Sequence, residues 1–550
     1  MRILVIGAVA AGTSAAAKAR RNDEHAEIVI YEKDQNISYS GCGLPYYIGD
    51  EIEDIDELTP RDPAFFKSKY NIDIFIGHEV VCIDTLQKQV EVKNLLTNET
   101  FIDQYDKLII ATGATPLIPN EVKGIQQKHV FTLRNVQSAN KIKQYIIDRK
   151  PKSAVIIGTG FIGFEMLENL TEHGITVSMI EKNDHIVPSL DIDVSQYLES
   201  MLTAYNVRIH KGVIVTSIDS NSVHLSNSDI VEADMVIVAM GVKPNVTLAE
   251  SAGVTLGVTE AIQVNSHMQT NISDIFACGD CVETYNIITK KPCYKPLGST
   301  ANKTGRIAGD QVTGGDLTYR GNLGTGIFKL FDLTVAFTGY SEQEAIKDGY
   351  EIVTCHNIKP DKPKYYHGKE MLIKAIADKQ TKRLLGVQII GHQGVDKRLD
   401  VFVTLITYGA TVDDLFHLDL AYAPPFSTTK DPVHYTGMIL DNAINKDRPM
   451  ITSDELRNLQ ANNVDIQVVD ARTSTQYQKS HIPGAINIPH KSIRKSLDSL
   501  NSSKLTVTYC NKGVTGNAVQ NILLGSGFKN VKNLSGGNKF YQRTNSKNEF

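Results

Sequence analysis

The stretch Ala154-Val-Ile-Ile-Gly158-Thr-Gly160-Phe-Ile-Gly163-Phe-Glu165 contains three glycines at the spacing of a dinucleotide-binding turn. Its apolar start predicts a buried strand, the glycines form a turn, and a helical pattern follows. Such a turn lets a pyrophosphate lie over the helix N-terminus. The next predicted strand, Thr176 to Glu181, ends in an acid 23 residues after Gly158, which suits a ribose hydroxyl. The stretch therefore predicts a dinucleotide site formed by Gly158, Gly160, Gly163 and Glu181.

A second unit of the same kind opens the chain. The strand pattern Arg2 to Ile6 runs into Gly7-Ala-Val-Ala-Ala-Gly12, where Val9 replaces the usual middle glycine. The following strand ends at Glu32, which lies 25 residues after Gly7. Two complete units in one chain predict two bound dinucleotides.

Three further buried-strand patterns end in small-residue turns. They end at Thr112-Gly113, at Gly241 and at Gly279-Asp280. Cys278 and Cys281 straddle the last turn as a C-x-x-C pair. We expect no metal there, because no second pair supplies the remaining ligands.

One cysteine lies between glycines in Ser38-Tyr-Ser-Gly-Cys42-Gly-Leu-Pro45-Tyr-Tyr47. Pro45 suits the first turn of a helix, so we expect the Cys42 thiol to lie at a helix N-terminus and to ionise easily. No second cysteine follows within this segment. The reaction partner of Cys42 must therefore come from outside this segment. It is either a small thiol such as coenzyme A, which gives a mixed disulfide, or peroxide, which gives a sulfenic acid.

The remaining chain changes character after Gly321. Alternating strands and a later helix predict an α+β region over 321–445, followed by a polar linker at 446–450. Residues 451–550 read as a small α/β unit in which a buried strand ends at Cys510. Backbone N–H groups of the loop after Cys510 can surround a thiolate or persulfide, and Lys512 adds positive charge.

Length and composition limit the protein class. A chain of 550 residues with 41% hydrophobic residues suits three or four domains. A formal net charge of −5, without a Lys/Arg run, argues against nucleic acid as a partner. We find no signal pattern or membrane segment, and seven scattered cysteines form no disulfide framework, so we expect a cytoplasmic protein.

Residues 1–445 resemble the pyridine nucleotide-disulfide oxidoreductase superfamily, and within it the coenzyme A-disulfide reductase and NADH oxidase branch. Residues 450–550 resemble a rhodanese domain through Asp470-Ala-Arg472, the loop His481 to Ala485 and the Cys510 loop. The fusion is similar to coenzyme A-disulfide or persulfide reductases that carry a C-terminal rhodanese. The matching features of the first region are Gly7 to Gly12, Glu32, Cys42 to Gly49, Ala111 to Gly113, Gly158 to Gly163, and Gly279-Asp280.

This resemblance implies an α/β fold with two Rossmann-like domains, an α+β dimerisation domain and a rhodanese-like α/β domain. The implied bounds are 1–113 plus 242–320 for FAD, 114–241 for NAD(P)H, 321–445 for dimerisation and 451–550 for the rhodanese. FAD is expected at the first unit, with Glu32 on its ribose and Asp280 near its ribityl chain. NADH or NADPH is expected at the second, and Glu181 favours NADH because a carboxylate repels a 2′-phosphate, although the adjacent Lys182 can soften this.

The resemblance also implies site residues in a homodimer. The hydroxyls of Tyr422, and of Tyr365 or Tyr366, would hydrogen-bond the sulfur of the other subunit's Cys42 or its partner. Arg472 and Lys512 would serve substrates at Cys510. Contacts to coenzyme A would fall on Ser14, Lys18, Arg21, Ser38, Lys69, Asn302 and Lys430.

The expected function is a flavin-dependent NAD(P)H reductase of coenzyme A persulfide, coenzyme A disulfide or polysulfide. Electrons would pass from the nicotinamide to FAD and then to a Cys42 mixed disulfide, while Cys510 would carry sulfane sulfur. Two alternatives remain open. One is an NADH oxidase or peroxidase that cycles Cys42 through sulfenic acid, and the other is a redox-sensing sulfur-carrier protein.

Overall fold

The structure is a computed structural model that describes residues 1–544. It contains two compact units. The first comprises Met1–Asp184 and Arg208–Gly324, and the second comprises His185–Val207 and the chain from Thr325 onward. None of the helices in the described residues is long and apolar enough to cross a membrane.

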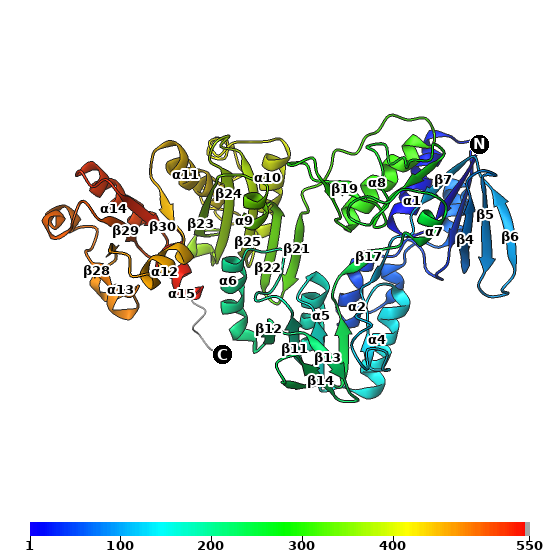
Figure 1. The fold of residues 1–550 in the computed structure, drawn as a ribbon, viewed down its shortest axis with the longest axis horizontal. Helices are drawn as coiled ribbons and strands as arrows, with labels where there is room; N and C mark the ends of the chain where they lie inside the picture. The colour runs from blue at the N-terminus through cyan, green and yellow to red at the C-terminus, as the bar shows by residue number, and fades with distance from the viewer. Residues whose placement is uncertain (545–550) are drawn as a thin grey trace. The chain divides into compact units, whose positions relative to one another are not determined.

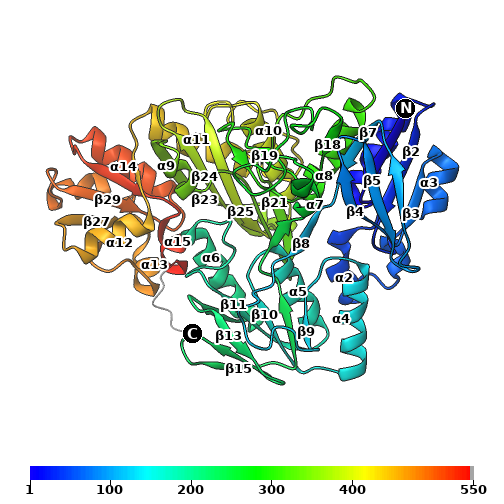
Figure 2. The same ribbon diagram turned by 45° about the vertical axis from the view of Figure 1, so that its right-hand side comes forward.

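The first unit holds two parallel five-stranded sheets. One has the order β18-β7-β1-β2-β3, so β7, near residue 110, pairs with a strand from beyond residue 270 (Figure 2). Its strands are β1 (Arg2–Ile6), β2 (Glu27–Glu32), β3 (Asp73–Ile76), β7 (Lys107–Ile110) and β18 (Ile275–Ala277). The helices α1 (Ala10–Asn22) and α8 (Gly298–Gln311) pack against each other beside it (Figure 1).

The second sheet of this unit has the order β12-β11-β10-β16-β9. Its strands are β9 (Val130–Phe131), β10 (Ser153–Ile157), β11 (Thr176–Glu181), β12 (Arg208–Lys211) and β16 (Met235–Val238). The helix α5 (Phe161–Glu172) follows β10 after the glycine turn, as the sequence from Ala154 to Glu165 predicts. The first sheet therefore combines strands from before residue 111 with one strand from after residue 274, while the second takes its strands from between residues 130 and 238. The finer domain bounds stay a prediction.

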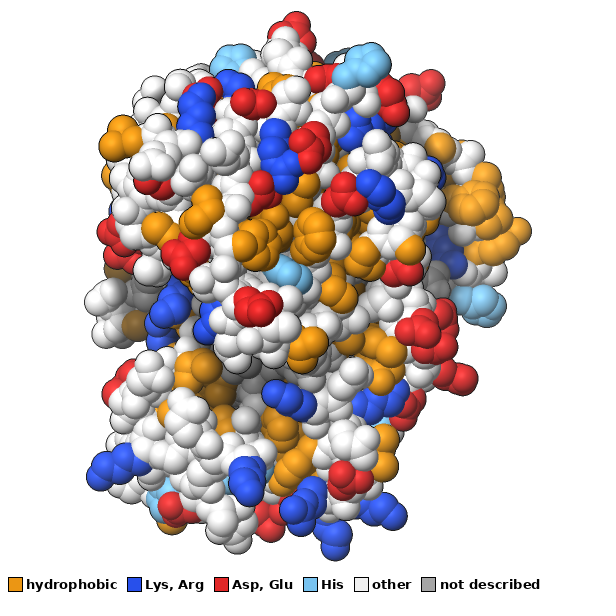
Figure 3. Space-filling model, turned by 90° about the vertical axis from the view of Figure 1, so that its right-hand side faces the viewer, with side chains coloured by type: hydrophobic (Ala, Val, Ile, Leu, Met, Phe, Trp, Pro, Cys, Tyr) orange, Lys and Arg blue, Asp and Glu red, His pale blue; other side chains and the backbone are white. Residues whose placement is uncertain are grey.

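Smaller elements complete the first unit. They are β4 (His78–Asp84), β5 (Gln89–Asn94), β6 (Thr100–Gln104), β8 (Ala114–Pro116), β13 (Val215–Ile218), β14 (Ser222–Leu225), β15 (Ile230–Glu232), β17 (Val242–Pro244), β19 (Thr284–Tyr285), β20 (Pro292–Cys293), α2 (Leu44–Ile48), α3 (Pro63–Tyr70), α4 (Val136–Arg149) and α7 (Thr247–Ser251). Figure 3 views the face on the right of Figure 1, where hydrophobic side chains lie among charged side chains of both signs.

The second unit contains an antiparallel sheet of order β21-β22-β25-β24-β23 and a parallel sheet of order β26-β30-β29-β27-β28 (Figures 1 and 2). The antiparallel sheet consists of β21 (Gly326–Leu330), β22 (Leu333–Gly339), β23 (Ile352–Pro360), β24 (Glu370–Asp378) and β25 (Leu384–Gly391). The parallel sheet consists of β26 (Met450–Ile451), β27 (Ile466–Asp470), β28 (Ala485–Asn487), β29 (Leu505–Tyr509) and β30 (Val531–Leu534).

The helices of the second unit are α6 (Ile192–Leu202), α9 (Glu342–Lys347), α10 (Val395–Thr407), α11 (Pro432–Asn445), α12 (Ser453–Ala461), α13 (Ser474–Lys479), α14 (Val514–Gly525) and α15 (Gly537–Arg543). α6 lies in the sequence between β11 and β12, yet it packs here against α15, where the Tyr197 and Phe540 rings stack with centroids 5.6 Å apart. The predicted α/β fold class, with two parallel-sheet nucleotide units followed by an antiparallel-sheet region and a small parallel-sheet region, is confirmed.

Candidate active sites

The first glycine turn has the shape that a flavin dinucleotide needs. Gly7 has a φ of +103°, and a Cβ there would lie 2.3 Å from the Ala111 carbonyl oxygen. A Cβ at Gly12 would lie 1.9 Å from the Gly7 carbonyl oxygen. Val9, at the N-cap of α1, provides no side-chain cap, so the first N–H groups of the helix are available to a pyrophosphate.

Glu32 ends β2 beside this turn. Its buried carboxylate accepts the backbone N–H groups of Ala8, at 2.7 Å, and Asp34, at 2.9 Å. Burial raises the pKa of Glu32. A carboxylate has further lone pairs for a ribose hydroxyl, so these residues fit the adenosine half of FAD.

The opposite side of the flavin site comes from two other strand ends. The Thr112 hydroxyl donates to the Asn245 carbonyl at 2.7 Å, next to Gly113. The N–H of Gly279 donates to the Thr304 hydroxyl at 3.0 Å, and Asp280 pairs with Arg134 at 3.0 Å. Arg134 is a residue that the sequence did not single out, because its partner is 146 positions away.

The second glycine turn offers more open space. A Cβ at Gly160 would meet no atom within 4 Å, whereas Gly158 and Gly163 are close to backbone carbonyls. Gly160 is the N-cap of α5 and provides no side-chain cap. The Glu181 carboxylate ends β11 and accepts the Thr159 N–H at 3.1 Å and the Thr159 hydroxyl at 2.6 Å. These residues fit a nicotinamide dinucleotide.

Cys42 lies exposed in a one-turn 3₁₀ helix, Gly41–Gly43, directly before α2. Pro45 occupies the first turn of α2, as predicted. The expectation of an easily ionised thiol is wrong for the protein alone: surrounding protein raises the pKa of Cys42, the charges of Glu165 and Asp280 add to the rise, and Arg134 opposes it. Glu165 lies on α5 after the second glycine turn, and Asp280 follows β18 of the first sheet, so charges from both nucleotide-binding sheets act on Cys42.

Glu165 is a functional candidate that the sequence analysis did not recognise. Burial, with a contribution from the charge of Glu168, raises the pKa of Glu165 to about 7. A carboxyl group that titrates near neutral pH beside a thiol can take up or give a proton. Glu165 lies two residues after Gly163, but its burial is not visible in the sequence.

A basic cavity of about 360 Å³ lies between α1, α3 and α8. It brings together the predicted residues Ser14, Arg21 and Asn302, and the Ser14 hydroxyl donates to the Asn302 side-chain oxygen at 2.8 Å. Two unpredicted arginines, Arg61 and Arg306, also line it. Arginine side chains suit phosphate groups, and the volume suits a small ligand.

Three other predicted contacts lie outside the lining of this cavity. Lys18 pairs with Asp310 at 2.9 Å, and Lys69 lies over the Phe65 ring with its Nζ 5.2 Å from the centroid. Ser38 has a φ of +50° and its N–H donates to the Ala8 carbonyl at 2.9 Å. Their roles toward coenzyme A stay predictions.

The predicted tyrosines belong to the second unit and are open to solvent. Tyr365 is 70% exposed, Tyr366 44% and Tyr422 47%. The rings of Tyr365 and Tyr366 lie 5.4 Å apart. Like Lys430, which is also exposed, they are available to a partner, and their contact with another subunit's Cys42 stays a prediction.

The second thiol, Cys510, follows β29 and is 6% exposed. Its loop leads into α14, and the first residues of α15 hydrogen-bond to the loop backbone. The N–H of Asn538 donates to the Cys510 carbonyl at 2.9 Å, and the N–H of Lys539 donates to the Asn511 carbonyl at 3.0 Å. These bonds fix the backbone of the loop whose N–H groups are predicted to surround an anion on the sulfur.

The two cations predicted for this site are both paired. Arg472 forms a buried ion pair with Asp470 at 2.6 Å and donates to the Ser480 carbonyl at 2.6 Å. Lys512 contacts Glu370, which is the first residue of β24 in the antiparallel sheet and also contacts Lys539. Arg472 therefore braces the base of the site, and Lys512 ties the Cys510 loop to β24.

The fold and the two thiol sites define a dinucleotide-dependent oxidoreductase joined to a rhodanese-type domain. The family model described as pyridine nucleotide-disulphide oxidoreductase matches residues 1–297, its dimerisation domain matches 326–432, and the rhodanese-like domain matches 452–544. The chain belongs to the pyridine nucleotide-disulphide oxidoreductase family, whose cofactors are FAD and NAD(P)H.

Individual proteins extend this assignment. The chain is 35% identical over 443 residues to the NAD(P)H sulfur oxidoreductase (CoA-dependent) of Pyrococcus furiosus. The match covers 80% of this chain and 99% of that protein. It is similar to the structure of reduced Bacillus anthracis CoADR-RHD, with a TM-score of 0.96 and 36% identity over 99% of this chain and 98% of that one. It is also similar to the NAD-dependent persulfide reductase of A. fulgidus, with a TM-score of 0.91 and 36% identity over 98% of this chain and 100% of that one.

Proposed function

We propose that this protein reduces coenzyme A persulfide, coenzyme A disulfide or polysulfide with electrons from NAD(P)H, and that Cys510 carries sulfane sulfur. The observation that carries the proposal is Cys42, which has no neighbouring cysteine in its motif and is acted on by the charges of Glu165, after the second glycine turn, and Asp280, after β18. Such a thiol has to pair with a sulfur of its substrate.

The cavity lined by Ser14, Arg21, Arg61, Asn302 and Arg306 would bind the phosphates of coenzyme A. The Cys42 thiolate would attack the coenzyme A-bound sulfur. The bond to the second sulfur breaks with its electron pair, and a Cys42–coenzyme A disulfide forms. A disulfide substrate releases a thiol, whereas a persulfide releases sulfide.

Gly7, Gly12 and Glu32 would hold FAD, and Gly158, Gly160 and Glu181 would hold the nicotinamide dinucleotide. When bound, these groups would supply the two electrons needed to return the mixed disulfide to the Cys42 thiolate and free coenzyme A. Glu165 is placed to exchange a proton with the departing sulfur, because its pKa is about 7 and its charge acts on Cys42. Glu181 favours NADH over NADPH, since its carboxylate repels a 2′-phosphate.

The active enzyme is proposed to be a cytoplasmic homodimer. The matched dimerisation domain supports this assembly, and the exposed Tyr365, Tyr366 and Tyr422 lie in or near that domain. Tyr422 and one of the adjacent pair would donate hydrogen bonds to the sulfur on the other subunit's Cys42. Lys430 would contribute to the same coenzyme A.

The sulfur reductase is favoured over the two alternatives, an NADH oxidase or peroxidase and a redox-sensing carrier. Two solved structures that match nearly the whole chain are CoADR-RHD and a persulfide reductase. The rhodanese-type domain with its Cys510 loop also suits sulfane sulfur rather than oxygen as the substrate.

An anaerobic assay tests the proposal. NADH oxidation and sulfide release are followed with coenzyme A persulfide, coenzyme A disulfide and polysulfide for wild type, Cys42→Ser and Cys510→Ser. We expect Cys42→Ser to lose all three reductase activities and Cys510→Ser to lose transfer from sulfane donors. Full activity of Cys42→Ser would refute the reductase mechanism. Coenzyme A in disulfide linkage to Cys42 in the purified protein gives an independent check.

A further inference from the structure

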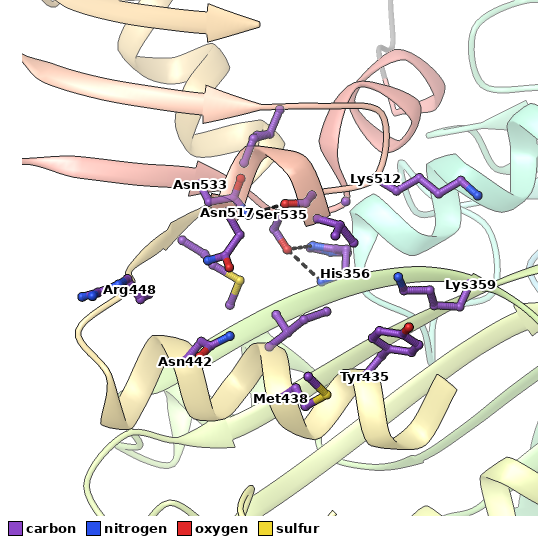
Figure 4. A pocket seen from close by; sticks show the side chains of 16 residues that line it. His356, Lys359, Tyr435, Met438, Asn442, Arg448, Lys512, Asn517, Asn533 and Ser535 are labelled. Atoms are coloured by element: carbon purple, nitrogen blue, oxygen red, sulfur yellow. Dashed lines mark hydrogen bonds between the residues drawn. The ribbon is translucent and has the colours of Figure 1, made fainter. Parts of the chain in front are cut away.

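A second cavity, of about 140 Å³, adjoins the Cys510 loop (Figure 4). The loop and the start of α14 form one wall through Lys512, Gly513 and Val514, and β23 with α11 forms the other. The cavity therefore lies between the rhodanese-type domain and the region that precedes it, which belong to the same compact unit.

The lining is mostly apolar with a few cations. Met438, Ile439, Met450, Val514 and Leu534 supply the apolar surface. Lys359, Arg448 and Lys512 supply positive charge, and Figure 4 shows Lys359 and Tyr435 on the side opposite the Cys510 loop. The lining residues include no carboxylate.

Lys359 is a cation of this cavity whose charge is not neutralised by a carboxylate; Arg448, which also has no carboxylate partner among the described residues, donates to the Lys446 and Asp447 carbonyls. The Nζ of Lys359 lies 3.8 Å from the centroid of the Tyr435 ring, and among the described residues no carboxylate forms an ion pair with it. Lys512, by contrast, shares Glu370 with Lys539. Burial and the charges of Lys512 and Lys430 lower the pKa of Lys359, while Cys510 acts in the opposite direction, so Lys359 lies within electrostatic reach of the thiol.

We propose that this cavity binds the anionic end of sulfur compounds that react at Cys510, and that Lys359, from outside the rhodanese-type domain, is a specificity-determining residue of that site. The inference rests on the proposed role of Cys510. In the reaction the Cys510 thiolate attacks the sulfane sulfur of the donor, a Cys510 persulfide forms, and the donor's S–S bond breaks. The leaving group departs as an anion with the bonding electron pair, and no net electrons are gained or lost.

Thiosulfate serves as the probe, because its leaving group is sulfite, a compact dianion that requires a nearby cation. Transfer of sulfur from thiosulfate to cyanide is measured with the full-length protein. The set comprises wild type, Lys359→Met, Lys359→Arg and Cys510→Ser, with Lys347→Met as a control for loss of an exposed lysine of the same unit. Circular dichroism melting verifies that each variant is folded.

We expect Lys359→Met to raise KM for thiosulfate about tenfold, because the substitution removes about one charged contact to the anion. Lys359→Arg should restore most of the affinity, and Lys347→Met should match wild type. Sulfite should protect Cys510 from iodoacetamide at lower concentration in wild type than in Lys359→Met. If Lys359→Met kept the wild-type KM and sulfite protection while Cys510→Ser was inactive, the inference would be wrong and the role of Cys510 would stand. Full activity of Cys510→Ser would overturn both.

Discussion

His356 and Asp193 are joined by a hydrogen bond of 2.7 Å from the imidazole Nε2 to a carboxylate oxygen, and both side chains are buried. The other imidazole nitrogen, Nδ1, lies 3.0 Å from the Ser535 hydroxyl, just before α15. One side chain of β23 thus connects the start of α6 to the segment that supports the Cys510 loop.

The same cluster contains a buried lysine. Lys374 is fully buried and contacts Asp193 at 2.7 Å, Glu342 at 2.9 Å and Asp191 at 3.0 Å. The three carboxylates lie close enough together to hold a metal ion, but the Lys374 ammonium is the cation that they surround. The carboxylates raise the pKa of Lys374.

Lys374→Met should therefore destabilise the second unit strongly. Removing the cation leaves three carboxylates without their partner, and breaking a buried pair costs about 3–5 kcal/mol. Denaturant unfolding followed by circular dichroism should show a lower midpoint. Lys379→Met, which removes an exposed lysine paired with Glu351, should cost at most about 1 kcal/mol. Equal midpoints for the two variants would contradict this account.

The pKa of Cys42 should respond in opposite directions to two substitutions. The charge of Glu165 raises the pKa of Cys42 and the charge of Arg134 lowers it. Glu165→Gln should therefore shift the pH profile of iodoacetamide alkylation at Cys42 to lower pH, and Arg134→Met should shift it to higher pH. Mass spectrometry of the labelled peptide isolates Cys42, and Cys42→Ser supplies the blank. Shifts in the same direction would exclude this electrostatic arrangement.

Glu165 should also make stability depend on pH. Its pKa rises from 4.5 to about 7 on folding, so the folded protein holds the proton more tightly than the unfolded chain does. The stability that this adds is complete below about pH 4.5 and is lost as the pH rises through about 7. Melting temperatures measured across that range should fall less steeply in Glu165→Gln than in wild type. An unchanged slope would show that Glu165 does not titrate in this way.

Arginines of the basic cavity should control affinity for coenzyme A substrates. Arg61→Met and Arg306→Met should each raise KM for coenzyme A disulfide about tenfold, because each removes a charged contact to phosphate. KM for NADH should stay within twofold, since neither residue lies at the second turn. Arg149→Met, at the exposed end of α4, serves as the control. An effect on NADH alone would move the coenzyme A site elsewhere.

Gly537 should matter to sulfur transfer more than to electron transfer. Gly537 has a φ of +62°, and a Cβ there would lie 2.5 Å from the Cys510 carbonyl oxygen and 2.8 Å from the backbone nitrogen of Lys512. Gly537→Ala should therefore distort the Cys510 loop and lower thiosulfate:cyanide transfer at least tenfold. Gly525→Ala is the matched control, because a Cβ at Gly525 meets no atom within 4 Å. Normal transfer by Gly537→Ala would show that the loop tolerates the displacement.

Local patterns were sufficient to predict much of the fold and both thiols. The two glycine turns and their terminal acids follow from short spacings along the chain, and the strand before Cys510 follows from its apolar run. The same reasoning could not locate Arg134, Arg61 or Arg306, because their neighbours are distant in the sequence. The raised pKa of Cys42 was also not predicted, since it depends on burial and on the charges of Glu165 and Asp280, which are distant in the sequence.

Helix α6 belongs to the second compact unit although β11 and β12, on either side of it in the sequence, belong to the first, and this limits how the protein can be truncated. The backbone passes between the two compact units at residue 184, at 207 and again at 324, so no single cut separates them. Truncation after residue 445 would also remove Ser535 from His356 and Phe540 from Tyr197. The C-terminal domain therefore also has a structural role. In a chain shortened at residue 445, His356 and Tyr197 would lose these partners, and other side chains would have to be introduced to cover them.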